Sequence, residues 1–287
     1  MKKVIKRLMV CSILIMIVGL IGCSKKEESK DTKTIGKENA KITLFAAKSL
    51  NKVMDEIIAE FNKKYPKVEV VGNYDSSGTL MTQIEEGASC DVFFSADTKQ
   101  MKELEEKKLV KEGTSHNLLN NRVCVVTYKG SKTKVTGLKD MGKASSLAIA
   151  GGSVPVGKYT RQALVNAKML SKKDDVAAIT TEEISKLYDG IEINECANVG
   201  AVTSAVSEGA NEIGTVYYSD TYGLEDKLEI VEKIPYDLTG DVIYPVGLVK
   251  NSEADKSQEK AAKDFINYLL SEDMAKVFEK YLFDVVD

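Results

Sequence analysis

From residue 41 onward, short apolar stretches of strand length alternate with longer segments whose apolar residues recur at helical spacing. The first pair is typical. Lys41–Ala46 is short and β-prone, whereas Ser49–Tyr65 has apolar side chains three and four positions apart. Because strands that alternate with helices form parallel βαβ units, this pattern predicts an α/β fold with helices on both faces of a sheet.

The same spacing predicts most of the remaining elements. Further strands are expected over 68–73, 91–95, 123–128, 146–150, 192–196, 213–218 and 244–249. Further helices are expected over 76–86, 98–107, 158–168, 200–208, 257–270 and 273–281. Ser49 is expected to cap the first helix, and Pro66 to end it.

The length of the chain, 287 residues, suits two lobes of roughly 120 residues each. Residues 41–120 together with 241–287 are expected to form lobe one, and residues 121–240 lobe two. The chain would then cross between the lobes twice, as in a hinge with open and closed states.

The first 40 residues have the features of an export and anchoring segment. Four basic residues precede the apolar run Leu8–Ile21, which at about 14 residues is shorter than the ~20 that a membrane-spanning helix needs. Cys23 follows this run directly after Gly22. We therefore expect a lipoprotein signal peptide over 1–22, lipidation of Cys23, and a flexible tether over 23–40 rather than a transmembrane anchor.

Removal of residues 1–22 changes the formal net charge from −3 to −7, because that segment holds four basic and no acidic residues. A net acidic protein is not typical of nucleic-acid binders. Any anion that it binds must therefore be held by local groups and not by overall charge.

Residues typical of metal clusters and catalysis are few. Cys90, Cys124 and Cys196 follow the predicted signal and tether, show no CxxC spacing, and predict neither a metal cluster nor a disulfide framework, although a single disulfide stays open. The one histidine, His116, lies in a polar connection and is expected to be a surface loop residue. The sequence gives no argument for catalysis, so we expect a protein that is not an enzyme.

Small or hydroxylated residues stand where strands give way to helices, at Ser49, Ser76–Gly78, Val156–Gly157 and Val199–Gly200. Each such turn presents free backbone N–H groups and the positive end of a helix dipole. Any one of them alone would be an ordinary helix start. Because ligands of open α/β sheets lie beyond the carboxyl ends of the strands, several together predict an anion site without formal positive charge.

Six segments in order along the chain resemble the periplasmic molybdate-binding proteins of ABC importers. They are FAAKSL at 45–50, YDSSGTLMTQIEEGASCDVFFSAD at 74–97, VPVGKY at 154–159, ANVGAV at 197–202, IGTVYYSD at 213–220 and YPVGLV at 244–249. The block that begins at the double serine is the most specific of them.

This resemblance implies a type II periplasmic-binding-protein fold, in which two α/β lobes are joined by a two-crossover hinge. It implies capture of molybdate or tungstate between the lobes and delivery to the membrane permease subunits of an ABC transporter. The protein is expected to act as a monomer on the outer face of the cell membrane. Neither a cofactor nor a directly coordinated metal is implied.

The resemblance also implies the residues that hold the oxyanion. Ser49 and Ser77 would each offer a hydroxyl and a backbone N–H, Val156 and Val199 a backbone N–H, and Tyr217 its hydroxyl. From its sequence context alone, Tyr217 could equally be a buried strand tyrosine.

Lys48 departs from the pattern, because many relatives carry a small residue at that place. Its side chain could attract anions over a distance. We expect it to point into solvent instead.

Two other functions stay open on the sequence. The ligand could be another small oxyanion, such as sulfate, or phosphate with Asp75 as an acceptor for its proton. An enzyme or an adhesin on the same fold is the second alternative. The carboxylates available as a general base are Asp91, Asp97 and Asp220, and we expect all three to be structural acids.

Overall fold

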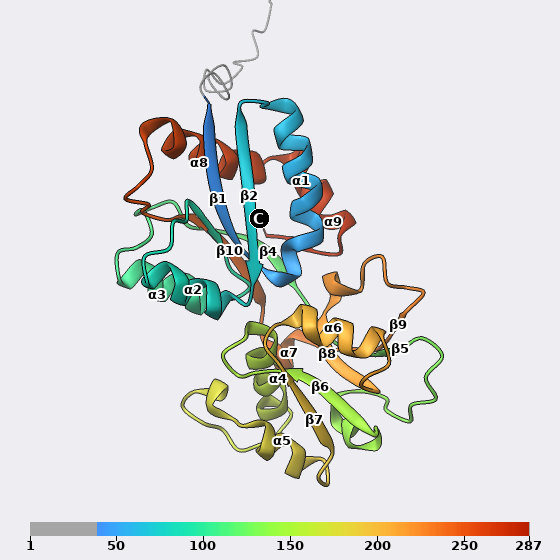
Figure 1. Ribbon diagram of the computed structural model, residues 1–287. Helices are drawn as coiled ribbons and strands as arrows, with labels where there is room; N and C mark the ends of the chain where they lie inside the picture. The colour runs from blue at the N-terminus through green and yellow to red at the C-terminus, as the bar shows by residue number, and fades with distance from the viewer. Residues whose placement is uncertain (1–38, 287) are drawn as a thin grey trace, which may run out of the picture. The chain divides into compact units, whose positions relative to one another are not determined.

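The computed structural model describes residues 39–286, which belong to a single compact unit of the chain, Ile35–Asp287 (Figure 1). The predicted signal peptide, Cys23 and nearly all of the tether lie outside the described residues. Among the helices of residues 39–286, none combines the length and the apolar character that a bilayer crossing requires.

The first of two sheets has six strands in the order β11-β4-β10-β3-β1-β2. Their bounds are β1 (Ala40–Ala47), β2 (Val68–Asp75), β3 (Val92–Phe94), β4 (His116–Asn121), β10 (Val242–Leu248) and β11 (Asp284–Val285). Strand β1 is parallel to both β2 and β3, whereas β10 is antiparallel to β3 and β4.

The second sheet has five strands in the order β7-β6-β8-β5-β9. Their bounds are β5 (Val123–Tyr128), β6 (Ser146–Ala150), β7 (Glu192–Cys196), β8 (Ile213–Tyr217) and β9 (Leu228–Lys233). Strand β6 is parallel to β7 and β8, and β5 is antiparallel to β8 and β9. Both sheets are therefore mixed: the expected parallel units are present, and β5 and β10, which follow the two crossings, are antiparallel to their neighbours.

Nine α-helices and four short 3₁₀ helices connect the strands of residues 39–286. The α-helices are α1 (Asn51–Lys64), α2 (Ser77–Glu85), α3 (Thr98–Glu106), α4 (Pro155–Asn166), α5 (Thr181–Leu187), α6 (Val199–Ser207), α7 (Tyr236–Thr239), α8 (Lys256–Leu269) and α9 (Glu272–Lys280). The 3₁₀ helices are η2 (Lys48–Leu50), η3 (Leu138–Lys143), η4 (Val176–Ala178) and η5 (Tyr218–Thr221).

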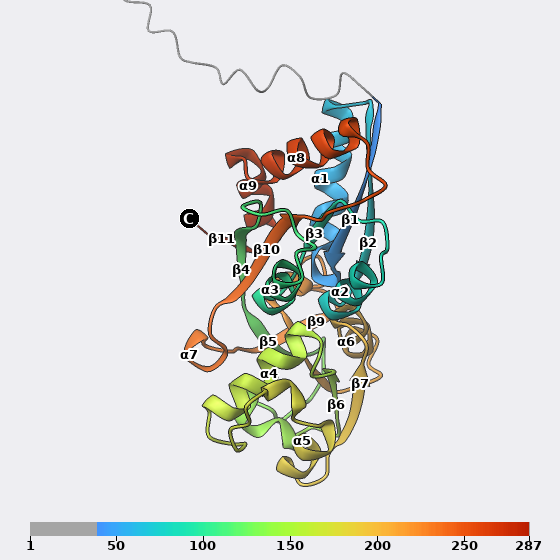
Figure 2. The same cartoon turned by 90° about the vertical axis from the view of Figure 1, so that its left-hand side faces the viewer.

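Apolar faces at helical spacing decide how these helices pack. Helix α1 buries Val53, Met54, Ile57 and Phe61, four positions on one face of the helix. The two figures show α2 next to α3, and α1 next to α9 (Figure 2). Within the latter pair the Lys280 ammonium lies 2.7 Å from the Glu56 carboxylate.

The chain passes between the sheets twice. Strand β4 ends at Asn121 and β5 begins at Val123, so a single residue makes the first crossing. The second crossing runs from the end of β9 at Lys233 to the start of β10 at Val242. The first sheet thus takes its strands from 40–121 and 242–285, and the second from 123–233. The division of the chain into two lobes near residues 120 and 240 stays a prediction.

Three local expectations are wrong. Ser49 is not a helix cap, because it lies in η2 and α1 begins only at Asn51. Helix α4 begins at Pro155 rather than Lys158, since proline is well suited to the first turn of a helix. His116 is exposed, but it opens strand β4 instead of lying in a loop.

The three cysteines of the described chain, Cys90, Cys124 and Cys196, are buried and free. Burial raises the pKa of the Cys124 thiol to about 12, which keeps it in the neutral form.

Candidate functional site

The residues predicted to bind the oxyanion converge on one small cavity. They are Ser49, Ser77, Val156, Val199 and Tyr217. Each lies at or just beyond the carboxyl end of a strand, namely β1, β2, β6, β7 and β8 respectively. The walls come from both sheets, which is where a ligand of an open α/β sheet is expected. That these five groups hold an ion stays a prediction.

Three helices direct their first turns at the cavity. Ser77 is the first residue of α2, Val156 the second of α4 and Val199 the first of α6. The first four N–H groups of a helix have no partner within it, and they carry the positive end of the dipole. The cavity is therefore lined by backbone groups suited to a negative ligand.

The caps of these helices leave the foremost N–H groups available. The Ser76 hydroxyl accepts a hydrogen bond from Thr79 N at 3.1 Å, and the Asn198 side chain accepts one from Ala201 N at 3.0 Å. Both caps thus occupy the third N–H of their helix, and the N–H of the first residue stays free to meet a ligand.

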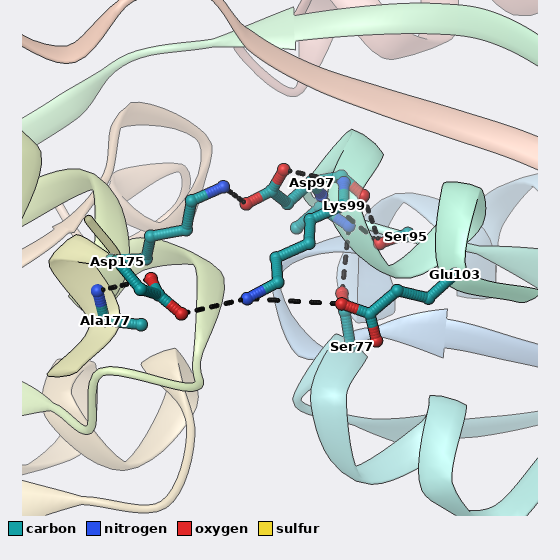
Figure 3. A network of polar contacts seen from close by, with 9 residues as sticks. Ser77, Ser95, Asp97, Lys99, Glu103, Asp175 and Ala177 are labelled. Atoms are coloured by element: carbon teal, nitrogen blue, oxygen red, sulfur yellow. Dashed lines mark hydrogen bonds and ion pairs between the residues drawn. The ribbon is translucent and has the colours of Figure 1, made fainter.

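The Ser77 hydroxyl is oriented as a donor towards the cavity. Its oxygen accepts a hydrogen bond from Ala96 N at 2.9 Å, a contact drawn in Figure 3. Because that lone pair is occupied from the protein side, the hydroxyl proton can point to a ligand.

The Ser49 hydroxyl is oriented by a short polar chain. Asn121 Nδ2 donates to Tyr244 Oη at 3.2 Å, and Tyr244 Oη lies 3.0 Å from Ser49 Oγ. Either hydroxyl can donate in the contact between Tyr244 and Ser49, and when the tyrosine donates, the serine proton is free for a ligand. Asn121 lies at the first crossing between the sheets, so this chain links the crossing to the cavity.

Tyr217 offers the clearest sign of a binding position. The residue is 1% exposed, and its hydroxyl makes no hydrogen bond of normal geometry among the described residues, although the Tyr244 hydroxyl is near enough to interact with it. Burial raises the pKa of this phenol well above its ordinary value, so it is a protonated donor. Buried hydroxyls are nearly always paired, which makes an unpaired one in a cavity wall a natural contact for a ligand.

Lys48 is the one charged residue among those that line the cavity. A Cβ added to Gly200 would lie 2.9 Å from Lys48 Cγ and 3.1 Å from Lys48 Cε. The aliphatic part of this half-buried side chain therefore packs over the start of α6, and the expectation that its ammonium points into solvent stays a prediction.

Ion pairs join the two walls beside the cavity. The Lys158 ammonium of α4 contacts the carboxylate of Asp97, whose side chain is 3% exposed. The Lys99 ammonium lies 3.3 Å from Asp175, between η4 and α3 (Figure 3). Sequence patterns do not reveal these pairs, because their members are 61 and 76 positions apart along the chain.

The four carboxylates considered as acceptors or general bases do not line the cavity. Asp91 accepts from Thr43 N at 2.7 Å and Asp97 caps α3 through Lys99 N at 3.0 Å. Asp75 accepts from Ser76 N at 2.7 Å and from the Asn198 side chain at 3.1 Å.

Asp220 occupies the turn behind Tyr217. It accepts from Tyr217 N at 3.0 Å, and burial raises its pKa to about 7, despite that hydrogen bond and the nearby Lys52. These contacts agree with structural roles for the carboxylates.

Taken together, the cavity offers neutral hydrogen-bond donors, one flexible cation and no carboxylate among its lining residues. Such a set can bind a small, fully deprotonated anion. Two α/β sheets joined by two crossings, with a small cavity between helix starts, have the architecture of a type II solute-binding protein.

Comparison with known proteins places the chain in a family. The model of the bacterial extracellular solute-binding proteins matches residues 42–284, and the chain belongs to this family. Export from the cytoplasm accords with that description.

Individual relatives agree with the predicted resemblance. The chain is 30% identical to "Putative ABC transporter substrate-binding lipoprotein YvgL" of Bacillus subtilis, over 91% of this chain and 92% of that one. It is 31% identical to a molybdate-binding protein of Haemophilus influenzae, over 85% and 90% of the two chains.

Among solved structures, one described as "substrate binding domain of putative molybdenum ABC transporter from Clostridium difficile" is 33% identical and superposes with a TM-score of 0.62. The match covers 87% of this chain and all of that one. The predicted fold class and the resemblance to molybdate-binding proteins are thereby confirmed.

Proposed function

We propose that this protein captures molybdate, and tungstate by the same contacts, and delivers it to the membrane subunits of an ABC importer. The relatives named as molybdate-binding proteins support this ligand. The observation that carries the proposal within this chain is the buried, unpartnered Tyr217 hydroxyl in a wall of helix-start N–H groups.

The donor set suits a tetrahedral dianion. Ser49 and Ser77 each provide a hydroxyl and an N–H, Val156 and Val199 an N–H, and Tyr217 a hydroxyl. Each hydrogen bond to a charged group contributes about 1.5–3 kcal/mol before the costs of desolvation and closure. About seven such bonds are enough for tight binding without a formal counter-charge in every contact.

Phosphate fits this cavity poorly. At neutral pH it carries a proton that needs an acceptor. The predicted acceptor, Asp75, does not line the cavity, and its carboxylate already accepts hydrogen bonds from Ser76 N and the Asn198 side chain. Sulfate has the same charge and shape as molybdate but shorter bonds to oxygen. Donors held rigidly by three helices therefore discriminate between the two ions by size.

Capture requires the walls to separate. The cavity has a volume of about 10 Å³, room for roughly one water-sized group. An ion enters when the two sheets move apart about the two crossings. The ion pairs Lys158–Asp97 and Lys99–Asp175, which join the two walls, then form again around the bound ion.

The location follows from the N-terminal segment. The mature protein is held on the outer face of the cell membrane by a lipidated Cys23, and the tether over 23–40 lets the folded part reach the importer. It acts as a monomeric binding protein and not as an enzyme.

The test is calorimetric titration of residues 24–287 with molybdate, tungstate, sulfate and phosphate. Molybdate and tungstate should bind with micromolar or tighter affinity, and sulfate and phosphate at least a hundredfold more weakly, about 2.7 kcal/mol. Tight sulfate binding without a molybdate response would contradict the proposal. Turnover of any substrate would favour an enzyme instead.

A further inference from the structure

We propose that Lys48 determines charge selectivity, making the cavity prefer dianions to monoanions of the same shape. This inference rests on the proposed capture of an oxyanion. It assigns a role to the one residue of the cavity that is not a neutral donor.

The first support is position. Lys48 is the only charged residue among the described residues that line the cavity, and it directly precedes Ser49. It also lines the adjoining outer groove, where Lys52, Lys227, Glu208 and Asp220 lie. Because Lys48 lines both the cavity and the groove, it lies where the two meet.

The second support is how the side chain is held. The Lys48 side chain occupies the space that a side chain at position 200 would need. A Cβ added to Gly200 would lie 2.9 Å from Lys48 Cγ and 3.1 Å from Lys48 Cε. Gly200 follows Val199 at the start of α6, on the wall opposite Ser49. Because Gly200 has no side chain, the aliphatic part of Lys48 can lie against the start of α6, beside the cavity.

The third support is that this ammonium has no direct partner among the described residues. No ion pair or hydrogen bond engages the Lys48 ammonium within residues 39–286, whereas Lys158 is paired with Asp97 and Lys52 donates to Tyr222 O at 2.7 Å. An ammonium group without a partner keeps its attraction for an entering anion.

The effect of the Lys48 charge can be distinguished from the effect of its packing by comparing ligands of different charge. Coulomb energy is proportional to the charge of the ligand, so the ammonium stabilises a dianion twice as much as a monoanion at the same place. The logarithm of the affinity lost on removing the charge is therefore twice as large for the dianion. Loss of packing by the aliphatic stem would weaken both ions by the same factor.

The experiment compares tungstate, a dianion, with perrhenate, a monoanion of the same tetrahedral shape and closely similar size. Dissociation constants are measured by calorimetry at low ionic strength for the mature protein and for Lys48→Met, which keeps an apolar stem without the charge. Tungstate binding should weaken about tenfold and perrhenate binding about threefold, so the preference for the dianion falls about threefold.

Two control variants sharpen the result. Lys48→Arg keeps the charge and should keep the preference for tungstate. Lys52→Met removes a neighbouring cation of the outer groove that does not line the cavity, and it should change the ratio of the two affinities much less than Lys48→Met does.

An unchanged ratio in Lys48→Met would overturn the inference, whether both affinities stay the same or fall equally. The proposed function would survive that result, since the unaltered protein would still bind tungstate tightly. If the unaltered protein binds no dianion, it is the proposed function that fails.

Discussion

Tyr217 and Tyr244 pack edge to face with ring centroids 5.7 Å apart, but their hydroxyl groups have different surroundings. Tyr244 Oη lies 3.0 Å from Ser49 Oγ and accepts from Asn121 at 3.2 Å. Tyr217 Oη makes no hydrogen bond of normal geometry among the described residues, and its nearest polar neighbour is the Tyr244 hydroxyl. The Tyr244 hydroxyl therefore links residues of the protein to one another, whereas the Tyr217 hydroxyl can bind a ligand.

Replacement of Tyr217 by phenylalanine should therefore affect binding and spare stability. Loss of one hydrogen bond to a dianion weakens molybdate binding by about 10- to 100-fold. The free energy of unfolding without ligand should stay the same or rise slightly, because a buried unpaired hydroxyl is removed. Calorimetry and urea denaturation measure the two effects.

Tyr244→Phe is the matched control, with the opposite expectation. Removing this hydroxyl leaves Asn121 without one acceptor and should lower the free energy of unfolding by about 1–3 kcal/mol. Molybdate binding should weaken only a few-fold, since Ser49 can still donate. Equal losses of affinity in the two variants would show that Tyr217 has no special contact with the ion.

The pair between Lys158 and Asp97 should govern how long the closed form lasts. Lys158→Met leaves the largely buried Asp97 carboxylate without its cation, which disfavours closure of the walls. Molybdate should dissociate several-fold faster, with a smaller change in its association rate. Stopped-flow tyrosine fluorescence after dilution measures the dissociation rate.

Lys186→Met serves as the comparison for that pair. Lys186 and Glu182 form an exposed pair within α5, with side chains 73% and 76% exposed. Exposed pairs contribute little, so this variant should release molybdate at the original rate. If both variants release it equally, the interwall pair has no part in closure.

The positions of the residues that line the cavity could be predicted from the sequence because local signals fix them. Ser77 and Val199 stand where a strand pattern changes to a helix pattern, and helix geometry then leaves their N–H groups free. Hydrogen bonds between residues far apart in the sequence cannot be predicted from local patterns. Asn121 and Tyr244 are 123 positions apart, and nothing local to either residue predicts their contact.

Two whole strands, β4 and β9, were missed because polar residues hide the period. Strand β4 reads HNLLNN and β9 reads LEIVEK, both too polar for an apolar alternation to stand out. The cap assigned to Ser49 was wrong because a 3₁₀ turn precedes α1. That turn points the serine hydroxyl at Tyr244, a contact that sequence spacing cannot anticipate.

Arg161 of α4 should be a major contributor to stability. The residue is 1% exposed and donates to three backbone carbonyls, Ile179 O at 2.6 Å and Ala150 O and Gly157 O at 2.9 Å. Arg161→Met removes these three buried hydrogen bonds and should lower the free energy of unfolding by about 3–5 kcal/mol. Urea denaturation monitored by circular dichroism measures the loss.

Gln162 is the neighbouring control on the same helix. Its side chain bonds only Asn166 at 2.9 Å, in an exposed position. Gln162→Ala should change stability by less than about 0.5 kcal/mol. A loss as small as this in Arg161→Met would mean that the three carbonyls find water when the guanidinium is removed.

Asp220 lies close to one charged side chain and two neutral polar groups. It accepts from Tyr217 N at 3.0 Å, and Lys52 of α1 and the phenol of Tyr244 in β10 also face it. Burial is the largest influence and raises the pKa of this carboxyl from 3.8 to about 7. The folded protein therefore holds a proton here in a pH range where the unfolded chain has lost it.

The consequence is a loss of stability as pH rises. Between pH 4 and 7 the folded state binds more protons at Asp220 than the unfolded state, so its contribution is fully present below pH 3.8 and lost as pH passes 7. Asp220→Asn keeps an acceptor for Tyr217 N but cannot ionise. Its free energy of unfolding relative to the unaltered protein should therefore increase from pH 5 to pH 8, as measured by urea denaturation at each pH. A constant difference across that range would mean that Asp220 titrates near the ordinary pKa of an aspartate.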